Sequence, residues 1–342
     1  MSAPTTAEAQ ALLDRAADAG VHRLSVPTPF TVGRVNCWLI DDDPLTLVDT
    51  GPNSGDALDT LEQALAQHGR RIGDLERIVI SHQHADHTGL ADILARRSGA
   101  EVCAITPLAA YLASHNEQTE ADDIFAEDQM RRHGVPADVV AVLRAVSAMA
   151  RGWGGRATVT RPLHDGEVLT FAGRSLRAWH RPGHSPSDTI FHDEQRGLLL
   201  AADHLLPHIS SNPLLSRSLD GRDHGRRPEA LVTYLASLRS TRAMDDVDVL
   251  LPGHGDPFAK PAALIDQRLR MHERRAEKIA GLIAEHPRTA YELGVALWGR
   301  VALTQAYLAL SEVLGHVDLL LRDGRVVEEP DDEGIVLLME AP

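Results

Sequence analysis

The stretch Ser81-His-Gln-His-Ala-Asp-His-Thr88 gathers three imidazoles and one carboxylate in a single short segment. Such dense packing of ligating side chains has few structural uses in a loop, whereas imidazole binds zinc, iron and nickel, and carboxylate adds a harder anionic ligand. The alternate residues His82 and His84 can point to one metal ion, and Asp86 and His87 can point to a second. The stretch therefore predicts a metal centre.

The residues on either side of this stretch predict a strand, a turn and a helix. Residues 77–80 form an apolar run typical of a short buried strand, and residues 88–97 carry apolar side chains at helical spacing. Upstream, residues 35–40 and 45–48 predict paired strands, and residues 55–68 predict a helix. This alternation of strands and helices is typical of a layered α/β domain.

The rest of the chain predicts three further segments. A helical insert is expected at about residues 109–156, and a second strand-rich half at about residues 158–251. From residue 261 the pattern predicts three helices followed by a hairpin, which is the element order of a winged helix. The sequence therefore predicts one domain over residues 1–260, with the insert, and a second, winged-helix-like domain over residues 261–342.

Composition narrows the class of protein. The chain has 342 residues, of which 43% are hydrophobic, enough for one large core and a small second domain. The sequence contains no run of about 18 apolar residues, so no membrane span is expected. The N-terminus does not resemble a signal peptide. Cys37 and Cys103 are the only cysteines, which favours a reduced cytoplasm over a disulfide framework. The net charge of −15 opposes attraction to nucleic acid or anionic lipid.

The histidine-rich stretch resembles the His-x-His-x-Asp-His signature of the metallo-β-lactamase superfamily. Four further segments match motifs of that family in the expected order over about residues 30–257, and they supply Asp49, His184, Asp203 and His254: Leu47-Val-Asp-Thr-Gly51, Pro182-Gly-His-Ser185, Ala201-Ala-Asp203 and Leu251-Pro-Gly-His-Gly255. A single short pattern recurs by chance, whereas five in sequence make a specific resemblance.

The resemblance implies an αββα sandwich with two metal sites at an edge where two sheets meet. The first metal would be held by His82, His84 and His184, the second by Asp86, His87 and His254, with Asp203 as the bridge. The metals implied are two Zn(II) ions per chain, with iron or manganese as alternatives. Asp86 would help to orient the nucleophile, and Asp49 would orient a ligand imidazole from behind.

Two parts of the chain are candidates for substrate contact. His204 and His208 flank Asp203, so both are expected near the metals, and each is a possible substrate contact. The insert is either a peripheral packing element or a lid over the substrate pocket, the second being common among members of the family.

The ligand set favours some functions within the family. The aspartate at position 203 resembles the bridging aspartate that glyoxalase II, the lactonases and the RNA-processing members carry at this position. The zinc β-lactamases of drug resistance do not have a bridging aspartate there. We therefore predict a dinuclear hydrolase of a thioester or ester of a small acyl compound, acting through a metal-bound hydroxide. The alternatives are an endoribonuclease-like member, a lactonase or β-lactamase, a mononuclear iron persulfide dioxygenase, and a non-catalytic binding protein.

The winged-helix-like unit raises the question of nucleic acid. Residues 262–342 contain fourteen acidic against nine basic residues, and the hairpin tip reads Glu328-Glu-Pro-Asp-Asp-Glu333. Because binding depends on basic side chains that neutralise phosphates, we predict no nucleic-acid partner and no membrane partner. The expected partner is a small-molecule substrate, and the unit is expected to close the pocket or to form a homodimer.

Overall fold

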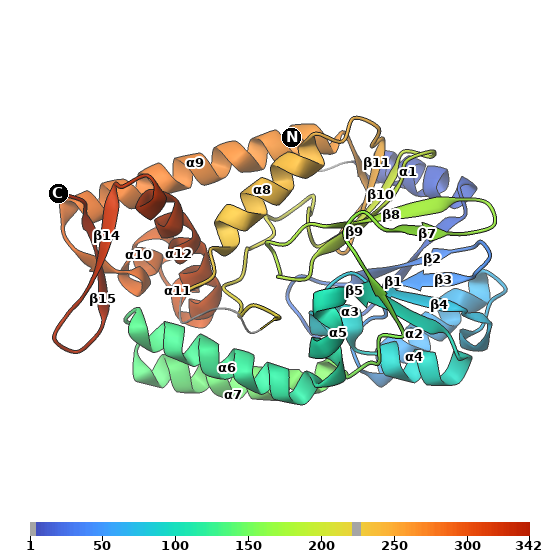
Figure 1. Ribbon diagram of the computed structural model, residues 1–342, viewed down its shortest axis with the longest axis horizontal. Helices are drawn as coiled ribbons and strands as arrows, with labels where there is room; N and C mark the ends of the chain where they lie inside the picture. The colour runs from blue at the N-terminus through green and yellow to red at the C-terminus, as the bar shows by residue number, and fades with distance from the viewer. Residues whose placement is uncertain (1–4, 221–226) are drawn as a thin grey trace.

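In the computed structural model, which describes residues 5–220 and 227–342, two six-stranded sheets face each other between layers of helices (Figure 1). The first sheet has its strands in sequence order: β1 (Val21–Val26), β2 (Val35–Ile40), β3 (Thr46–Val48), β4 (Arg77–Ile80), β5 (Glu101–Ile105) and β6 (Arg161–Leu163). The second sheet runs from β12 (Phe258–Ala259) through β11 (Val249–Pro252), β10 (Leu198–Ala202), β9 (Thr189–Asp193) and β8 (Ser175–His180) to β7 (Val168–Thr170).

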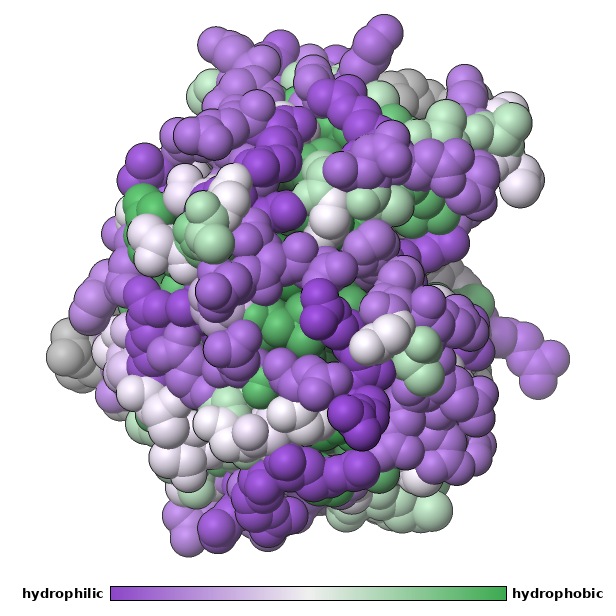
Figure 2. Space-filling model, turned by 90° about the vertical axis from the view of Figure 1, so that its right-hand side faces the viewer, coloured by the Kyte–Doolittle hydropathy of each residue, from purple (hydrophilic) through white to green (hydrophobic). Residues whose placement is uncertain are grey.

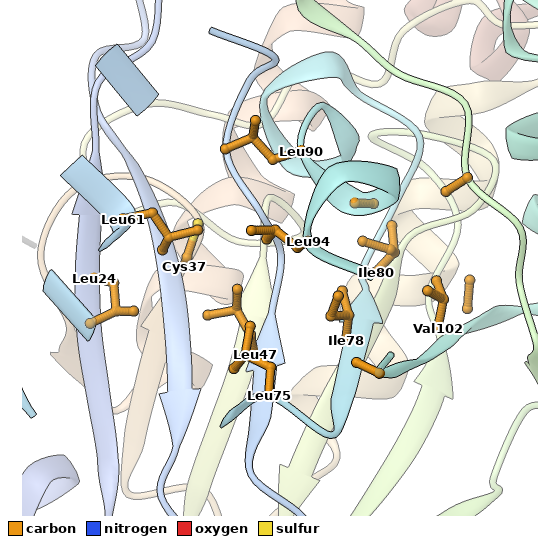
Figure 3. Close-up of a cluster of buried hydrophobic side chains, with 14 of the residues drawn as sticks. Leu24, Cys37, Leu47, Leu61, Leu75, Ile78, Ile80, Leu90, Leu94 and Val102 are labelled. Carbon is orange, nitrogen blue, oxygen red and sulfur yellow. The ribbon is translucent and has the colours of Figure 1, made fainter. Parts of the chain in front are cut away.

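The two-residue period of the strands explains the layers. In β4, Val79 packs between the sheets, whereas its neighbours Ile78 and Ile80 face the helices outside the first sheet. Figure 3 shows this outer side, where Ile78 and Ile80 lie near Leu94 of α4 (Ala91–Ser98). Helix α2 (Gly55–Gln67) packs on the same face. The second sheet is covered by α8 (Ala230–Arg242) and the start of α9 (Pro261–Glu285). The predicted αββα sandwich is therefore confirmed.

The helix expected at residues 88–97 is divided, which corrects that prediction. Helix α3 (Ala85–Thr88) ends before Gly89, and α4 begins at Ala91. A Cβ at Gly89 would lie 2.2 Å from the backbone nitrogen of Asn53 and 2.5 Å from the carbonyl oxygen of Trp153, so two other segments approach the chain closely here. As a result Asp86 and His87 lie in a short helix that is separate from α4.

The insert and the C-terminal elements pack against each other at the end of the sandwich (Figure 1). The insert consists of α5 (Thr106–Ala113), α6 (His115–Arg132), α7 (Ala137–Ala150) and a 3₁₀ turn (Arg151–Trp153), which confirms the helices predicted there. The C-terminal elements after α9 are β13 (Arg288–Thr289), α10 (Ala290–Trp298), α11 (Val301–Thr304), α12 (Ala306–Arg322), β14 (Val326–Pro330) and β15 (Val336–Glu340). Met130 and Val140 of the insert share one hydrophobic cluster with Val313 of α12.

The C-terminal elements follow the predicted order of helices and hairpin, with β15 between β13 and β14. Thr289 caps α10 and forms a capping box with Glu292. Helix α9 is unbroken. It contacts α8, which covers the second sheet, and it also contacts α12 among the C-terminal elements. The division at residue 260 and the winged-helix likeness therefore stay predictions.

One element escaped the sequence patterns. Helix α1 (Thr6–Asp18) packs on β1 and β12, and Ala16 reaches the cluster between the sheets. Its N-terminus carries a capping box between Thr5 and Glu8, which is a signal visible in the sequence. Another short element, a 3₁₀ turn, lies at Ile72–Asp74.

The surface agrees with the acidic, polar composition. Figure 2 shows the end of the sandwich opposite the C-terminal elements, where hydrophilic residues dominate and hydrophobic ones show mainly in recesses. Among the described residues, no helix combines the length and hydrophobicity that crossing a lipid bilayer requires.

Candidate metal centre

Every predicted ligand lies just beyond the end of a strand or in the turn that follows one. His82 and His84 come after β4, and Asp86 and His87 follow in α3. In the second sheet, His184 lies between β8 and β9, Asp203 follows β10, and His254 follows β11. Since β3, β4 and β5 are parallel to one another and β10 is parallel to β11, these strand ends meet at one edge of the sandwich. The structure therefore brings all seven residues together.

His82, His84 and His184 form the first group. Their ligand nitrogens lie within 4.8 Å of one another, with 3.1 Å between His82 Nε2 and His84 Nδ1 and 3.0 Å between His84 Nδ1 and His184 Nε2. Burial, and then the neighbouring His184, lower the pKa of His84 to about 3. Burial and His87 also hold the pKa of His82 well below its usual value. Both imidazoles are therefore neutral at physiological pH, which is the form that binds a metal.

Asp86, His87 and His254 form the second group, again within 4.8 Å of one another. Asp86 Oδ2 lies 3.3 Å from His254 Nε2. Although burial favours its neutral form, His87 and His254 hold the pKa of the Asp86 carboxyl well below its usual value. Asp86 is thus an anionic oxygen ligand beside two imidazoles.

Hydrogen bonds on the far side of the rings orient the imidazoles. His184 Nδ1 lies 3.0 Å from the carbonyl oxygen of Asn212, and His254 Nδ1 lies 2.9 Å from that of Arg34. A carbonyl only accepts, so each Nδ1 donates, and in the neutral form of each ring the Nε2 lone pair is directed at the cluster. Such outer contacts are what fix metal-binding histidines in proteins.

Asp49 holds His87 in the same way. Its Oδ2 lies 2.7 Å from His87 Nδ1 and accepts a hydrogen bond from the Ser81 hydroxyl at 2.7 Å, while Oδ1 accepts from the Ser81 backbone N–H at 2.8 Å. Burial opposes a charge on His87, yet Asp49, Asp203 and Asp86 raise its pKa to about 10, so a cation bound at its Nε2 would replace a proton there. The backbone of Asp49 is left-handed, at φ 60°, a conformation that costs energy for a non-glycine residue. Its contacts are those of a positioning residue.

Asp203 lies between the two groups. Its Oδ1 is 3.5 Å from His87 Nε2, and its Oδ2 is 3.6 Å from His184 Nε2 and 3.5 Å from His254 Nε2. Within the described part of the chain, Asp203 Oδ1 and His87 Nε2 are buried without a hydrogen-bond partner. Buried polar atoms in that state are destabilising, and a bound cation would satisfy both. The residues present therefore fit a metal centre.

Close backbone approach completes the cluster. A Cβ at Gly253 would lie 2.2 Å from Asp203 Oδ1 and 3.0 Å from His87 Cε1. The glycine next to His254 thus leaves the space that the Asp203 carboxylate and the His87 ring occupy. A larger residue at this position would displace ligand atoms from both groups.

The structure does not bring the two candidate substrate contacts into the cavity beside the cluster. His204 is buried, its Nε2 lies 2.9 Å from the Thr241 hydroxyl of α8, and its ring packs edge-on against Tyr234. Burial lowers the pKa of His204 to about 3. His208 is exposed and lies beside Gly255. Neither side chain lines this cavity, although His208 lies beside the residue that follows the predicted ligand His254, so substrate contact stays a prediction for both residues.

A cavity of about 500 Å³ opens beside the first group. Gln83, His84 and Ala85 line one part of it, and the remaining walls come from α5, α6, α7, residues 214–217 and α12. The insert is therefore more than peripheral packing, which favours its interpretation as a lid. Sequence patterns missed Tyr307, because a lone tyrosine in a helix gives no sign of the cavity that it lines.

Comparison with known proteins agrees with this geometry. The model of the metallo-beta-lactamase superfamily matches residues 30–254, and the chain belongs to that superfamily. It is 31% identical over 303 residues to the probable metallo-hydrolase YqjP of Bacillus subtilis, covering 88% of this chain and 92% of the relative. A solved beta-lactamase domain protein from Burkholderia ambifaria superposes with a TM-score of 0.80 at 28% identity, covering 94% of this chain and 92% of that one.

A more distant relative carries the name of an activity. The atrochrysone carboxyl ACP thioesterase AgnL7 of Paecilomyces divaricatus is 24% identical over 251 residues, which are 73% of this chain and 59% of that protein. The relatives of this chain thus include one protein named as a metallo-hydrolase and one named as a thioesterase. The chain is a metal-binding hydrolase.

Proposed function

We propose that this hydrolase is a dinuclear zinc enzyme that cleaves a thioester or an ester of an acyl compound. The observation that carries the proposal is Asp203, whose Oδ1 faces His87 of the second group and whose Oδ2 faces His184 of the first group and His254 of the second. His82 also lies close to His87 and Asp203, so the two groups are continuous. The named thioesterase among the relatives favours thioesters as the substrate class.

The roles of the residues follow from their contacts. His82, His84 and His184 would hold one zinc ion, Asp86, His87 and His254 the other, and Asp203 would contact both. Zinc ions held by these residues would lower the pKa of bound water toward neutrality and would polarise the substrate carbonyl. Asp86, anionic at neutral pH, would accept a hydrogen bond from the attacking water. The water oxygen bonds to the carbonyl carbon, the C–S bond breaks, and the products are a carboxylate, a thiol and a proton.

Metal content and substrate class test this proposal together. The purified protein is expected to contain about two zinc ions per chain by elemental analysis, and to hydrolyse thioesters in a panel that also holds lactones, β-lactams and short RNA. His254→Ala is expected to lower the zinc content, because it removes a ligand of the second group. His286→Ala, which removes an exposed imidazole at the end of α9, is the matched control. One iron per chain, with dioxygen consumed on a persulfide, would refute the proposal.

The C-terminal elements are proposed to complete the cavity rather than to bind nucleic acid. Tyr307 and Leu308 of α12 lie in the cavity wall, whereas the hairpin tip between β14 and β15 carries acids, which phosphates repel most strongly at low salt. We therefore expect no binding of duplex DNA or RNA in an anisotropy titration at about 50 mM salt. Binding that tightens as salt falls, and is lost on deletion of residues 262–342, would contradict this expectation. The homodimer stays a prediction.

A further inference from the structure

The cavity beside His84 is walled mainly by apolar side chains from distant parts of the chain. Figure 1 shows α6 and α7 running from the sandwich toward α12, and the cavity lies among these helices. The apolar residues that line it are Phe125, Ala126 and Met130 of α6, Leu143 and Val146 of α7, Leu214, Leu215, and Tyr307 and Leu308 of α12.

The charged side chains and tyrosine hydroxyls of the same walls are engaged within the protein, whereas His115, also in the wall, has both ring nitrogens buried without a hydrogen-bond partner among the described residues. Arg144 pairs with Asp123 at 2.6 Å, and Arg217 pairs with Asp122 at 3.0 Å. The Tyr111 hydroxyl donates to Asp122 at 2.9 Å, and the Tyr307 hydroxyl donates to the carbonyl oxygen of Leu215. These charges and hydroxyls are therefore satisfied within the protein. What the walls offer to a ligand is chiefly apolar surface, whose burial is favourable.

We propose that this cavity binds the apolar acyl chain of the substrate, an assignment that rests on the proposed thioesterase function. A thioester has two halves, and when the carrier is a polar thiol such as coenzyme A only the acyl half is apolar. The carrier belongs toward solvent, and the acyl chain belongs between α6, α7 and α12. Because His84 of the first group lies in the same cavity wall, an acyl chain bound there has its carbonyl carbon beside that group.

The volume of the cavity limits the length of the acyl chain that it can hold. A cavity of about 500 Å³ falls in the range that takes drug-sized ligands. An acetyl group would leave most of the apolar wall exposed to water. The preferred substrate is therefore an acyl thioester with roughly eight or more carbon atoms, which is drug-sized, rather than the small acyl compound expected from the ligand motifs.

A series of saturated acyl coenzyme A thioesters from two to sixteen carbons tests the proposal with the zinc-loaded, full-length protein. The value of kcat/KM is expected to rise about threefold to fourfold with each added methylene, because each one leaves water for an apolar wall, and to level off when the cavity is full. Equal values for acetyl and dodecanoyl thioesters would overturn the acyl-chain assignment while thioester hydrolysis stands.

Two neighbouring residues of α7 provide a matched pair of variants. Leu143 lines the cavity, whereas Val142, 62% exposed, does not. Leu143→Trp is expected to lower kcat/KM for the dodecanoyl thioester about twentyfold more than for the acetyl thioester, because it removes the room for two or three methylenes. Val142→Trp is expected to leave the ratio unchanged. Ala126→Phe fills the same cavity from α6 and repeats the test should Leu143→Trp fold poorly.

Direct binding separates the two hypotheses. The fluorescent fatty acid 11-(dansylamino)undecanoic acid is expected to bind the wild type and Val142→Trp, and to bind Leu143→Trp at least about tenfold more weakly. Binding that is equal in all three proteins would overturn the location of the acyl chain. If the probe binds as expected but no thioester is hydrolysed, the proposed function fails and the acyl assignment fails with it, leaving an apolar-ligand cavity of another enzyme.

Discussion

Asp203→Ala is expected to lower kcat for thioester hydrolysis by about a thousandfold, equivalent to about 4 kcal/mol of transition-state stabilisation. The reason is that one carboxylate faces both ligand groups, at 3.5 Å from His87 Nε2 of the second group and 3.6 Å from His184 Nε2 of the first. Without it, two cations would repel each other with no anion between them. Steady-state kinetics on the zinc-loaded variant would measure the loss.

The fold should survive this substitution, because Asp203 follows the end of β10 and belongs to none of the hydrophobic clusters. Circular dichroism of Asp203→Ala is therefore expected to match the wild type. The matched control is Asp59→Ala, which removes a carboxylate from an exposed position on α2 and should leave kcat unchanged. Near-normal turnover of Asp203→Ala with a full complement of metal would contradict the bridging role.

Arg227→Met is expected to lower the free energy of unfolding by about 3 to 5 kcal/mol, because removing one partner leaves buried charges uncompensated. The Arg227 guanidinium lies 2.5 Å from Asp318 of α12 and 2.9 Å from Glu328 of β14. The Arg227 side chain is 11% exposed and that of Asp318 only 6% exposed. Urea unfolding followed by circular dichroism would measure the change. Arg325→Met, which breaks an exposed ion pair with Glu277, should cost about 1 kcal/mol or less.

The deficit of Arg227→Met should depend on pH. Burial raises the pKa of Asp318 to about 6, even though Arg227 acts to lower it. Because this value lies above the ordinary value of about 3.9 in an unfolded chain, Asp318 favours folding most at low pH, and that contribution is lost as pH rises through about 6. Removal of Arg227 raises the pKa further. The deficit should therefore be larger at pH 8 than at pH 5, and a deficit independent of pH would refute this coupling.

Local sequence patterns predicted the strands that carry the candidate ligands, and the family resemblance named the candidate ligands, which the structure brings together. The apolar run before His82 is β4, and the run before Asp203 is β10, because buried strands leave an uninterrupted hydrophobic signature in the sequence. The ligands follow such runs directly, and for this reason their convergence could be expected from strand ends alone. The role of Asp49 behind a ligand imidazole was also a prediction, and its contact with His87 has the expected form.

Features that depend on distant parts of the chain were not visible in this way. The break between α3 and α4 follows from the approach of Asn53 and Trp153 to Gly89, and no helical periodicity reports that approach. The cavity arises because Tyr307 and Leu215, far apart in the sequence, come together. The hydrogen bond of His204 to Thr241 could not be predicted for the same reason, since it depends on how α8 packs. Local patterns specify elements, and tertiary packing decides which side chains share a space.

The walls of the cavity and the metal ligands come largely from different stretches of the chain, and this separation bears on how such enzymes diverge. The cavity is lined by residues 83–85, the insert, residues 214–217 and α12. Of the seven predicted ligands, His84 alone lies in these stretches. Substitutions in them can alter which molecule enters without disturbing the chemistry at the strand ends. Descendants of one ancestor can therefore keep an identical ligand set while consuming unrelated metabolites. Selection for a new substrate would first change the residues of α6, α7 and α12 that line the cavity.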